Sequence, residues 1–425
     1  MKLNYRRTFF IGLAFLSISA FWQMYDNIVP LILQGTFHLN ETITGGIMAA
    51  DNVLAVFLLP LLGSLSDKAD TRFGRRTPFI VVGTVLAVAL MMVLPYADRT
   101  ANFALFVGAL FFLLIAMGLY RSPAVALMPD LTPKPLRSQA NAVINLMGAV
   151  GGIYTLGLIS LLLKGEKPDY TPVFAGVAGL MVLAVALLLL TVREKRLAAL
   201  VAEENLREES EEEAEADRTG ELAPDVKRSL QMILLSIFLW FMAYNAVTTA
   251  FSRYARTVWG MEGGGFANCL MVATVAAIVS YIPIGMISAR VGRRRCIQGG
   301  LVLMLVSFFA AIFFVRYHGA INIGFALIGM GWAAVSVNSL PMVVEMCSSG
   351  DVGKYTGLYY TFSMAAQIVT PILSGAFLQY VSYRTLFPYA CVFTVAAMFT
   401  MSRVRHGDNR PPRKKKLLEN FDTED

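Results

Sequence analysis

The stretch 60-PLLGSLSDKADTRFGRRTPF-79 decides the fold. An apolar segment ends near Ser66, and the short loop after it carries two acidic and four basic side chains. A second apolar segment begins at Pro78, and proline is well tolerated in the first turn of a helix. Because only a short loop joins the two predicted helices, we expect them to lie antiparallel and side by side. The basic residues of the loop also predict which side of a membrane it occupies.

The composition of the whole chain agrees with a membrane location. Of the 425 residues, 56% are hydrophobic and only 15% are charged, whereas soluble domains carry about 25% charged residues. The mean hydropathy is +0.60. The formal net charge of +7 is typical of basic loops facing the cytoplasm and its anionic lipids. We therefore expect the lipid bilayer as a partner and no nucleic acid.

Twelve segments are long and apolar enough to cross a bilayer, which takes roughly 20 residues. They lie near 8–34, 42–66, 78–96, 102–123, 139–163, 172–192, 228–250, 264–289, 296–315, 320–344, 353–379 and 384–402. None alternates polar and apolar residues as barrel strands do, so helices are expected. The first segment continues to about Leu33, too far for the apolar part of a signal peptide. The sequence predicts an all-α membrane protein with twelve transmembrane helices.

Lysine and arginine gather in alternate loops, which sets the expected orientation. They are dense at 68–76, 134–137, 193–196, 290–295 and 403–416 and sparse in the opposite loops. By the positive-inside rule, both termini lie in the cytoplasm. We expect a multi-pass protein of the cell membrane.

The middle of the chain changes character and divides the twelve segments six and six. The predicted organisation is an N-terminal half at 1–192, an acidic cytoplasmic linker at 193–227, a C-terminal half at 228–402 and a basic cytoplasmic tail at 403–425. The linker is expected to be a solvated tether, with a regulatory or partner-binding role as the alternative.

The two halves echo each other. Trp22 and Asn27 match Trp240 and Asn245, Gly74-Arg75-Arg76 matches Gly292-Arg293-Arg294, each 218 positions later, and Asp130 has a counterpart in Glu345, 215 positions later. Three weak matches at nearly one offset predict two pseudo-symmetric six-helix bundles. In such repeats, related by an axis along the membrane normal, the substrate site lies near the midplane between the halves.

The loop with Gly63, Ser66, Asp67, Arg72, Gly74, Arg75 and Arg76 resembles the signature loop of the major facilitator superfamily. The longer stretches 63–80 and 121–143 look most like the sucrose and glycoside carriers of that superfamily. The resemblance implies a secondary transporter that alternates access, with the signature loop as a cytoplasmic latch.

Ten residues are expected to act in gating: Gly63, Asp67, Arg72, Gly74, Arg75, Arg76, Arg121, Asp130, Arg137 and Glu345. The acidic Asp67 could face the positive N-terminus of the helix that begins near Lys354. The arginines could pair with acidic residues of neighbouring helices, and Arg121 with Asp130 or Asp67. The structural alternative for the basic residues is a topology signal with lipid contact.

Asp26 and Asp51 stand inside predicted spans. Asp26 comes 17 residues after Phe9, or roughly 25 Å along a helix at 1.5 Å per residue. A carboxylate at that depth costs about 3 kcal/mol unless it is paired, hydrated or protonated. Both residues are therefore expected to couple transport to a cation, H⁺ or Na⁺, or to bind sugar hydroxyls. The alternatives are a structural polar partner or a place closer to the external water.

The resemblance also implies which helices surround the cavity, and their polar and aromatic residues are the substrate-binding candidates. They are Trp22, Gln23, Asp26, Asn27, Tyr120, Tyr244, Asn245, Thr248, Trp332 and Asn338. Hydroxyl partners and aromatic faces suit a sugar, although core packing is the alternative for each aromatic. One departure matters: the related plant carriers have an acidic residue in the fourth helix where this chain has Leu114.

No enzyme motif, cofactor or metal site is expected. The four cysteines and three histidines are scattered, and no Gly-rich nucleotide loop is present. The sequence therefore predicts a sugar or glycoside transporter, monomeric and coupled to a proton or sodium ion. The alternatives are a uniporter or exporter of another small polar or drug-like solute, and a membrane sensor on the same fold.

Overall fold

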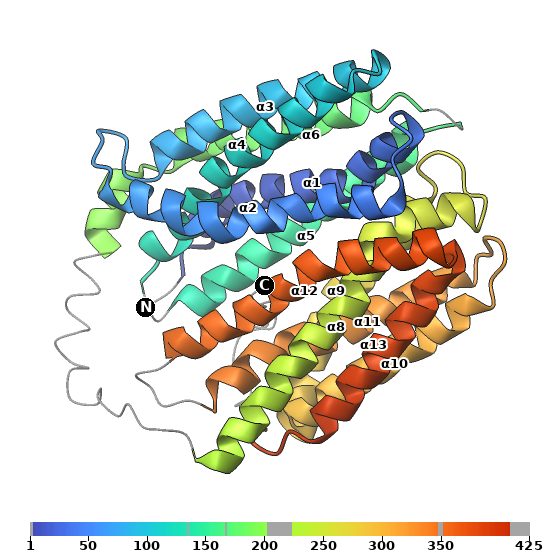
Figure 1. Ribbon diagram of the computed structural model, residues 1–425. Helices are drawn as coiled ribbons and strands as arrows, with labels where there is room; N and C mark the ends of the chain where they lie inside the picture. Colours follow the sequence, from blue (N-terminus) through green and yellow to red (C-terminus); the bar gives the residue numbers. More distant parts are fainter. Residues whose placement is uncertain (1–2, 134–135, 166–167, 202–222, 347–351, 409–425) are drawn as a thin grey trace. The chain divides into compact units, whose positions relative to one another are not determined.

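The computed structural model describes residues 3–133, 136–165, 168–201, 223–346 and 352–408, and these are almost entirely helical (Figure 1). The helices before residue 200 are α1 (Tyr5–Gly35), α2 (Glu41–Lys68), α3 (Thr77–Arg99), α4 (Phe103–Asp130), α5 (Arg137–Leu162) and α6 (Thr171–Thr191). Those after it are α8 (Pro224–Thr257), α9 (Phe266–Val291), α10 (Arg293–Ile312), α11 (Ile321–Val344), α12 (Val352–Tyr380), the short 3₁₀ helix η3 (Tyr383–Thr385) and α13 (Leu386–Ser402).

The predicted fold class is confirmed. Within the described residues, twelve helical segments are long and apolar enough to cross a membrane, and the structure there contains no strand. Large apolar side chains such as Phe57, Phe112 and Leu190 remain on the surface. That exposure suits helices whose outer faces meet lipid, because lipid tails do not disfavour apolar contact as water does.

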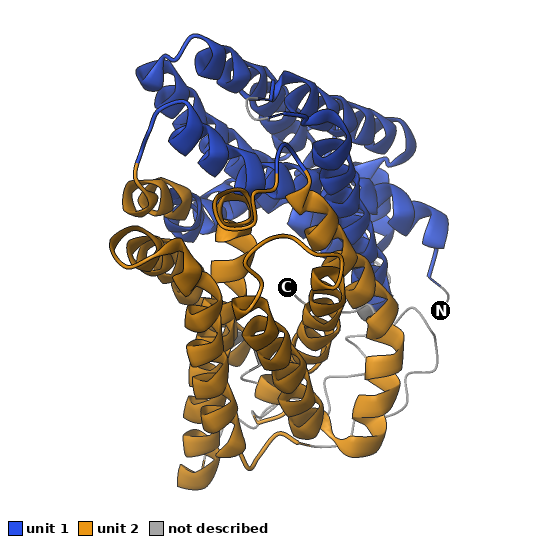
Figure 2. Cartoon of the chain, turned by 90° about the vertical axis from the view of Figure 1, so that its right-hand side faces the viewer, with its two compact units in different colours: residues 1–39, 50–212, 262–264 blue, residues 40–49, 213–261, 265–425 orange. Residues whose placement is uncertain are grey.

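The chain forms two compact units, coloured separately in Figure 2. Unit 1 comprises residues 1–39, 50–212 and 262–264, and unit 2 comprises residues 40–49, 213–261 and 265–425. Helix α2 is thus shared, because its first turns belong to unit 2 and its remainder to unit 1. The predicted boundaries at 192, 228 and 402 stay predictions.

The helices of the two units pack in the same pattern. In unit 1, α1 contacts α5 and α6, and α3 contacts α4 and α6. In unit 2, α8 contacts α12 and α13, and α10 contacts α11 and α13. Helix α9 packs closely on α11, whereas α2 meets α4 more loosely, at the Ser122 hydroxyl, which donates to the Leu59 carbonyl at 3.0 Å. The repeat expected from the sequence therefore extends to the packing of each bundle.

Glycine permits the closest helix contacts in each unit. A Cβ on Gly151 of α5 would lie 2.0 Å from the Leu16 carbonyl oxygen of α1, and a Cβ on Gly329 of α11 would lie 1.9 Å from the Ala273 oxygen of α9. These separations leave no room for a side chain. Small residues at such crossings let membrane helices pack backbone to backbone.

Short segments that follow α6 and α13 also pack against the bundles. Residues 194–201 are helical, and Glu194 and Val201 are buried. Val404 is fully buried, and the Arg405 backbone N–H donates to the Ser229 hydroxyl at 3.2 Å. These parts of the expected linker and tail therefore belong to the folded bundles, while 202–222 and 409–425 lie outside the described residues.

The glycine contacts predict a position-specific effect within α5. Gly151→Val should lower the melting temperature in detergent by several degrees, because overpacking typically costs about 1–3 kcal/mol and the Leu16 backbone cannot yield easily. Gly157→Val on the same helix is the matched control, since nothing lies within 4 Å of a Cβ there. Equal melting temperatures for the two variants would contradict the close α1–α5 contact.

Candidate functional site

Two carboxylates lie near each other in the span region of the chain. Asp26 on α1 and Asp51 on α2 are both half-buried, and each lies within range of the other's charge. The Asn52 side chain donates to Asp51 Oδ1 at 2.8 Å. Like charges this close disfavour the state in which both carboxyls are ionised, so the pair is suited to hold a proton or to share a cation.

Arg121 of α4 joins this group. Its guanidinium lies 5.6 Å from the ring centroid of Trp22 on α1, and it interacts electrostatically with Asp51. The sequence suggested Asp130 or Asp67 as its partner, but both of those carboxylates bond Arg76 instead. Arg121 is therefore placed with the substrate and coupling candidates, and its gating role stays a prediction.

Aromatic rings border the same region of α1. Trp22 meets Tyr25 edge to face, with ring centroids 5.4 Å apart, and Trp22 itself is half-buried. Its indole Nε1 has no hydrogen-bond partner among the described residues. The neighbouring Gln23 is also half-buried. This buried, unpaired indole donor belongs to a ring that lies against the Arg121 guanidinium, and it could donate to a substrate hydroxyl group that reaches it.

Unit 2 contains a second candidate surface. Tyr244 of α8 stacks on Trp332 of α11, with ring centroids 3.8 Å apart and planes 9° apart, and Phe241 meets the same indole edge to face. The buried Asn245 Nδ2 has no hydrogen-bond partner among the described residues. Thr248, one turn further, donates to the Tyr244 carbonyl at 3.3 Å. The stacked rings and the free amide together offer an aromatic face and a donor.

Three of the predicted substrate residues are instead buried with polar partners. The Tyr120 hydroxyl is 2.5 Å from Ser17 Oγ and 3.1 Å from the Ala14 oxygen. Asn27 Nδ2 donates to the Gln23 oxygen at 2.9 Å. Asn338 donates to the Ala334 oxygen at 2.8 Å and accepts a hydrogen bond from Ser288. This geometry favours packing roles for Tyr120 and Asn338, whereas the buried Asn27 Oδ1 has no hydrogen-bond partner among the described residues. Substrate contact by all three stays a prediction.

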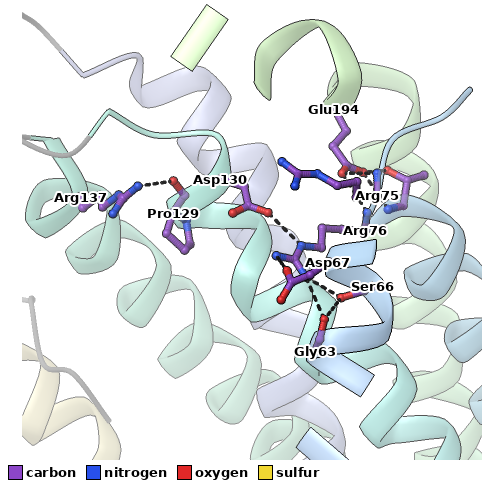
Figure 3. Close-up of polar contacts among 10 residues, drawn as sticks. Gly63, Ser66, Asp67, Arg75, Arg76, Pro129, Asp130, Arg137 and Glu194 are labelled. Carbon is purple, nitrogen blue, oxygen red and sulfur yellow. Dashed lines mark hydrogen bonds and ion pairs between the residues drawn. The ribbon is translucent and has the colours of Figure 1, made fainter. Parts of the chain in front are cut away.

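Arg76 is the centre of the loop between α2 and α3 (Figure 3). Its Nε lies 2.8 Å from Asp130 Oδ2 of α4, one terminal nitrogen pairs with Asp67, and another donates to Ser66 Oγ at 2.5 Å. Burial favours the neutral form of Arg76, but the hydrogen bond and charge of Asp130 and the charge of Asp67 outweigh it and raise the guanidinium pKa. Arg76 therefore pairs with acidic residues of two helices, as expected. The predicted contact of Asp67 with the helix near Lys354 stays a prediction.

Glu194 is the residue of this cluster that the sequence reading missed. Its carboxylate accepts hydrogen bonds from the backbone N–H groups of Arg75, Arg76 and Thr77 at 2.7–2.8 Å and from the Thr77 hydroxyl at 2.7 Å. An anion at a helix N-terminus meets unpaired N–H groups and the positive end of the helix dipole. Glu194 thus anchors the start of α3, and the only signal in the sequence was a single acidic residue within the basic run 193-REKR-196.

The other loop candidates have simpler surroundings. Gly74 has a φ of +121°, and a Cβ there would lie 2.3 Å from Glu194, so glycine is required. Arg72 is exposed and lies 4.6 Å from the ring of Phe73. Arg75 is also exposed. Two further predicted gating residues make hydrogen bonds through or to backbone carbonyls. The Gly63 carbonyl in α2 accepts from Ser66 Oγ at 2.8 Å. Arg137, the first residue of α5, donates to the Pro129 carbonyl at 3.1 Å.

Unit 2 repeats this arrangement at the start of α10. Arg293 pairs with Glu345, the residue directly after α11, and the Arg294 backbone N–H donates to Asp408 Oδ1 at 2.8 Å. Gly292 has a φ of +93°, and a Cβ there would lie 2.8 Å from Asp408. Asp408 therefore occupies the place that Glu194 holds in unit 1. Arg293 makes the ion pair that corresponds to that of Arg76, although the 218-residue sequence offset aligns Arg293 with Arg75.

No group of three or more acidic, histidine or cysteine side chains within the described residues could hold a metal ion. Cys269, Cys296 and Cys391 are free thiols, and Cys347 lies outside the described residues. The chemistry available at these sites is therefore that of carboxylates, one guanidinium, amides and aromatic rings.

Comparison with known proteins matches this picture. The family model described as Major Facilitator Superfamily matches residues 11–281 and 265–422. The sucrose transport proteins SUC3 and SUC4 of Arabidopsis thaliana are 26% identical over 151 residues and 33% identical over 113 residues. These alignments cover 31% and 23% of this chain and 25% and 22% of the relatives. The chain therefore spans about a quarter of the length of these curated relatives.

Solved structures resemble the whole chain. The nucleoside transporter NupG has a TM-score of 0.69 at 12% identity and covers 94% of this chain and 100% of its own. The xylose transporter XylE from E. coli has a TM-score of 0.65 at 15% identity and covers 98% of each chain. At these identities the likeness shows the fold alone.

The cap on α3 predicts that Glu194→Gln lowers the melting temperature in detergent. The amide keeps one acceptor but turns an NH₂ group toward N–H donors, and charge-assisted hydrogen bonds are each worth about 1.5–3 kcal/mol. Lys195→Gln is the matched control, because Lys195 and its partner Asp70 are exposed and such pairs contribute about 0–1 kcal/mol. If Glu194→Gln and Lys195→Gln both have the melting temperature of the wild type, Glu194 does not stabilise the start of α3.

Proposed function

The chain belongs to the Major Facilitator Superfamily, and on that premise we propose that it carries a sugar or glycoside across the cell membrane by alternating access. Its family and its fold make it a membrane transporter rather than an enzyme. The proposed mode is symport with a cation, in the simplest case a proton. Both termini are proposed to lie in the cytoplasm.

The observation that carries the sugar proposal is the similarity to two sucrose transport proteins. The side chains of the candidate sites fit that chemistry. Pyranose rings present C–H faces that pack on aromatic rings, and hydroxyls that bond to amides and carboxylates. Trp332 stacked on Tyr244 supplies the first kind of contact, while Asn245 and Trp22 have free donors for the second.

The coupling proposal rests on the two carboxylates. Asp51 accepts a hydrogen bond from Asn52 and has the positive charge of Arg121 near it. Asp26 faces the charge of Asp51, which opposes its ionisation. Loading of this pair with one proton, and release when Arg121 and the substrate rearrange, would couple proton movement to sugar movement. Because Leu114 replaces the acidic residue of the related carriers, Asp26 and Asp51 are the proposed route.

In this scheme the Arg76 cluster and its counterpart at Arg293 are cytoplasmic latches. Each joins a helix start to carboxylates of neighbouring helices within one bundle. The acidic partners Asp67 and Glu345 are at least partly exposed, so breaking and re-forming such pairs at a helix end costs less than the same exchange in hydrocarbon. The gating assignments of Arg72, Arg75 and Arg137 rest on the resemblance and await direct measurement.

Counterflow in liposomes tests the sugar proposal. Purified protein loaded with an unlabelled sugar should take up the labelled sugar transiently, and a panel of disaccharides and glycosides would identify the substrate. Failure across a broad panel would reject the sugar assignment and favour another small solute or a sensor. Accumulation that is indifferent to pH and Na⁺ gradients would favour a uniporter.

Asp51→Asn should abolish gradient-driven accumulation while retaining sugar exchange, because the amide can still accept hydrogen bonds but cannot carry a proton. Uptake with and without an imposed pH gradient, beside counterflow, separates the two activities. Asp169→Asn is the control, since the exposed Asp169 accepts a hydrogen bond from the Thr171 N–H at the start of α6, and an asparagine oxygen can accept the same bond. Undiminished accumulation by Asp51→Asn would reject Asp51 as a coupling residue.

Trp332→Leu should raise the half-saturating sugar concentration roughly two- to tenfold, because an aromatic stacking contact is worth about 0.5–1.5 kcal/mol. The maximum exchange rate should change little. Tyr380→Leu provides the control, since Tyr380 is an exposed aromatic at the end of α12. An unchanged concentration dependence would remove Trp332 from the binding surface.

A further inference from the structure

An apolar groove lies between α10 and α11, near the loop at 313–320 that joins them. Its volume is about 210 Å³. The lining includes Val306 and Ala310 of α10, Phe314 of the loop, and Ile323 and Gly324 of α11. None of these residues belongs to the candidate sites described above, so the groove has no part in the proposed transport scheme.

The groove suits hydrocarbon rather than water. Among the lining residues only Ser307 has a polar side chain, and its hydroxyl already donates to the Leu303 carbonyl at 2.8 Å. Apolar cavities of roughly 150 Å³ stay dry yet accept a guest as large as benzene, and this groove is larger. A Cβ on Gly324 would have the Ser307 Cβ as its nearest neighbour, at 4.0 Å. The missing side chain of Gly324 therefore leaves room that methylene groups can fill.

The groove is continuous with an exposed apolar face of α10. Val302, Val306 and Phe309 are exposed, and their spacing places them on one face of the helix. Ile323 of α11 is 66% exposed. Because Val306 and Ile323 also line the groove, it opens onto this face. In a membrane span such a face meets lipid tails, so the acyl chain of a lipid is the occupant at hand.

The loop at the end of the groove carries an unpaired positive charge. Phe314 and Ala320 both line the groove, and Arg316 lies between them in the chain. Arg316 is exposed and takes part in none of the ion pairs of the described residues. Lysine and arginine are sparse in the loops of this side, so the positive-inside rule does not account for it. A lipid phosphate would complement this charge.

The loop is held in place by aromatic residues. The Trp259 indole donates to the Phe314 carbonyl at 3.0 Å, and the Tyr317 N–H donates to the Trp259 carbonyl at 3.5 Å. The His318 ring stacks on Phe314 with centroids 6.5 Å apart, and its Nδ1 accepts from the Ala320 N–H at 3.2 Å, which leaves Nε2 to carry a proton. Tryptophan and tyrosine are typical of the headgroup level of a membrane, where a phosphate would lie.

We propose that the groove between α10 and α11 binds one acyl chain of an anionic phospholipid, whose phosphate pairs with Arg316. The Nε2–H of His318 is a second donor for the same phosphate. The bound chain fills the space beside Gly324 and joins α10 to α11 on the face that meets the bilayer. On the proposed orientation the lipid belongs to the external leaflet. The site is independent of the cargo and of the coupling ion.

Photolabelling tests the acyl-chain groove. A phosphatidylglycerol with a diazirine in one acyl chain, present below saturation in detergent with the full chain, should label peptides that contain residues 302–328. Gly324→Leu should lower this labelling at least about tenfold, because its side chain takes the place of several buried methylene groups. Gly299→Leu on α10 is the matched control, since nothing lies within 4 Å of a Cβ there. Equal labelling of wild type and Gly324→Leu would overturn the proposal, including the case in which Gly324→Leu instead separates a dimer.

The headgroup has its own test, which also decides the proposal if Gly324→Leu does not fold. Arg316→Gln should lower labelling by the phosphatidylglycerol about fivefold, the effect of one basic residue near an anionic lipid. Labelling by a phosphatidylcholine with the same acyl chains should be weaker in the wild type and unchanged by Arg316→Gln. Arg295→Gln is the control, since Arg295 is exposed near the opposite end of α10. Equal labelling by the two lipids, or no effect of Arg316→Gln, would overturn the proposal.

Discussion

A charge placed in hydrocarbon costs about 2.5–3.5 kcal/mol or more unless it is paired or hydrated, and this constraint arranges the whole molecule. It moves most acidic and basic residues to helix ends, where Arg76 is held by carboxylates of two helices and Arg253 by Glu41. It also makes the exceptions informative. Asp26 and Asp51 lie within spans, where carboxylates are kept only at a free-energy cost, and ionisable residues in such places are by default candidates for a functional site.

In both bundles a carboxylate bonds the start of a helix, but the two bundles differ at their centres. Glu194 and Asp408 each fold back from the segment after the sixth helix of their bundle to bond the start of the third. At the central positions, however, Trp22 is half-buried beside Arg121, while its counterpart Trp240 is fully buried. The repeat therefore preserved the anchoring of each bundle, while the candidate binding surfaces diverged into a charged one and an aromatic one.

Hydropathy was sufficient to predict the twelve helices, because lipid leaves the backbone few alternatives. The loop motif was sufficient to predict that Arg76 pairs with acidic side chains. The anchor Glu194 was missed because its bonds join positions more than a hundred residues apart. The hydrogen-bond partners of Tyr120 and Asn338 could not be predicted, because polarity in a sequence does not reveal whether a partner is already present; substrate contact by these two residues stays a prediction.

We propose that sugar movement and cation movement are one process in this protein. Proteoliposomes that enclose a pH-sensitive dye, with no imposed gradient, measure it most directly. Adding the transported sugar outside should acidify the lumen, in proportion to sugar uptake, and a protonophore should abolish the signal. Sugar uptake with no change in luminal pH would contradict proton symport. If that uptake were also equal in the presence and in the absence of Na⁺, it would contradict sodium symport and leave a uniporter.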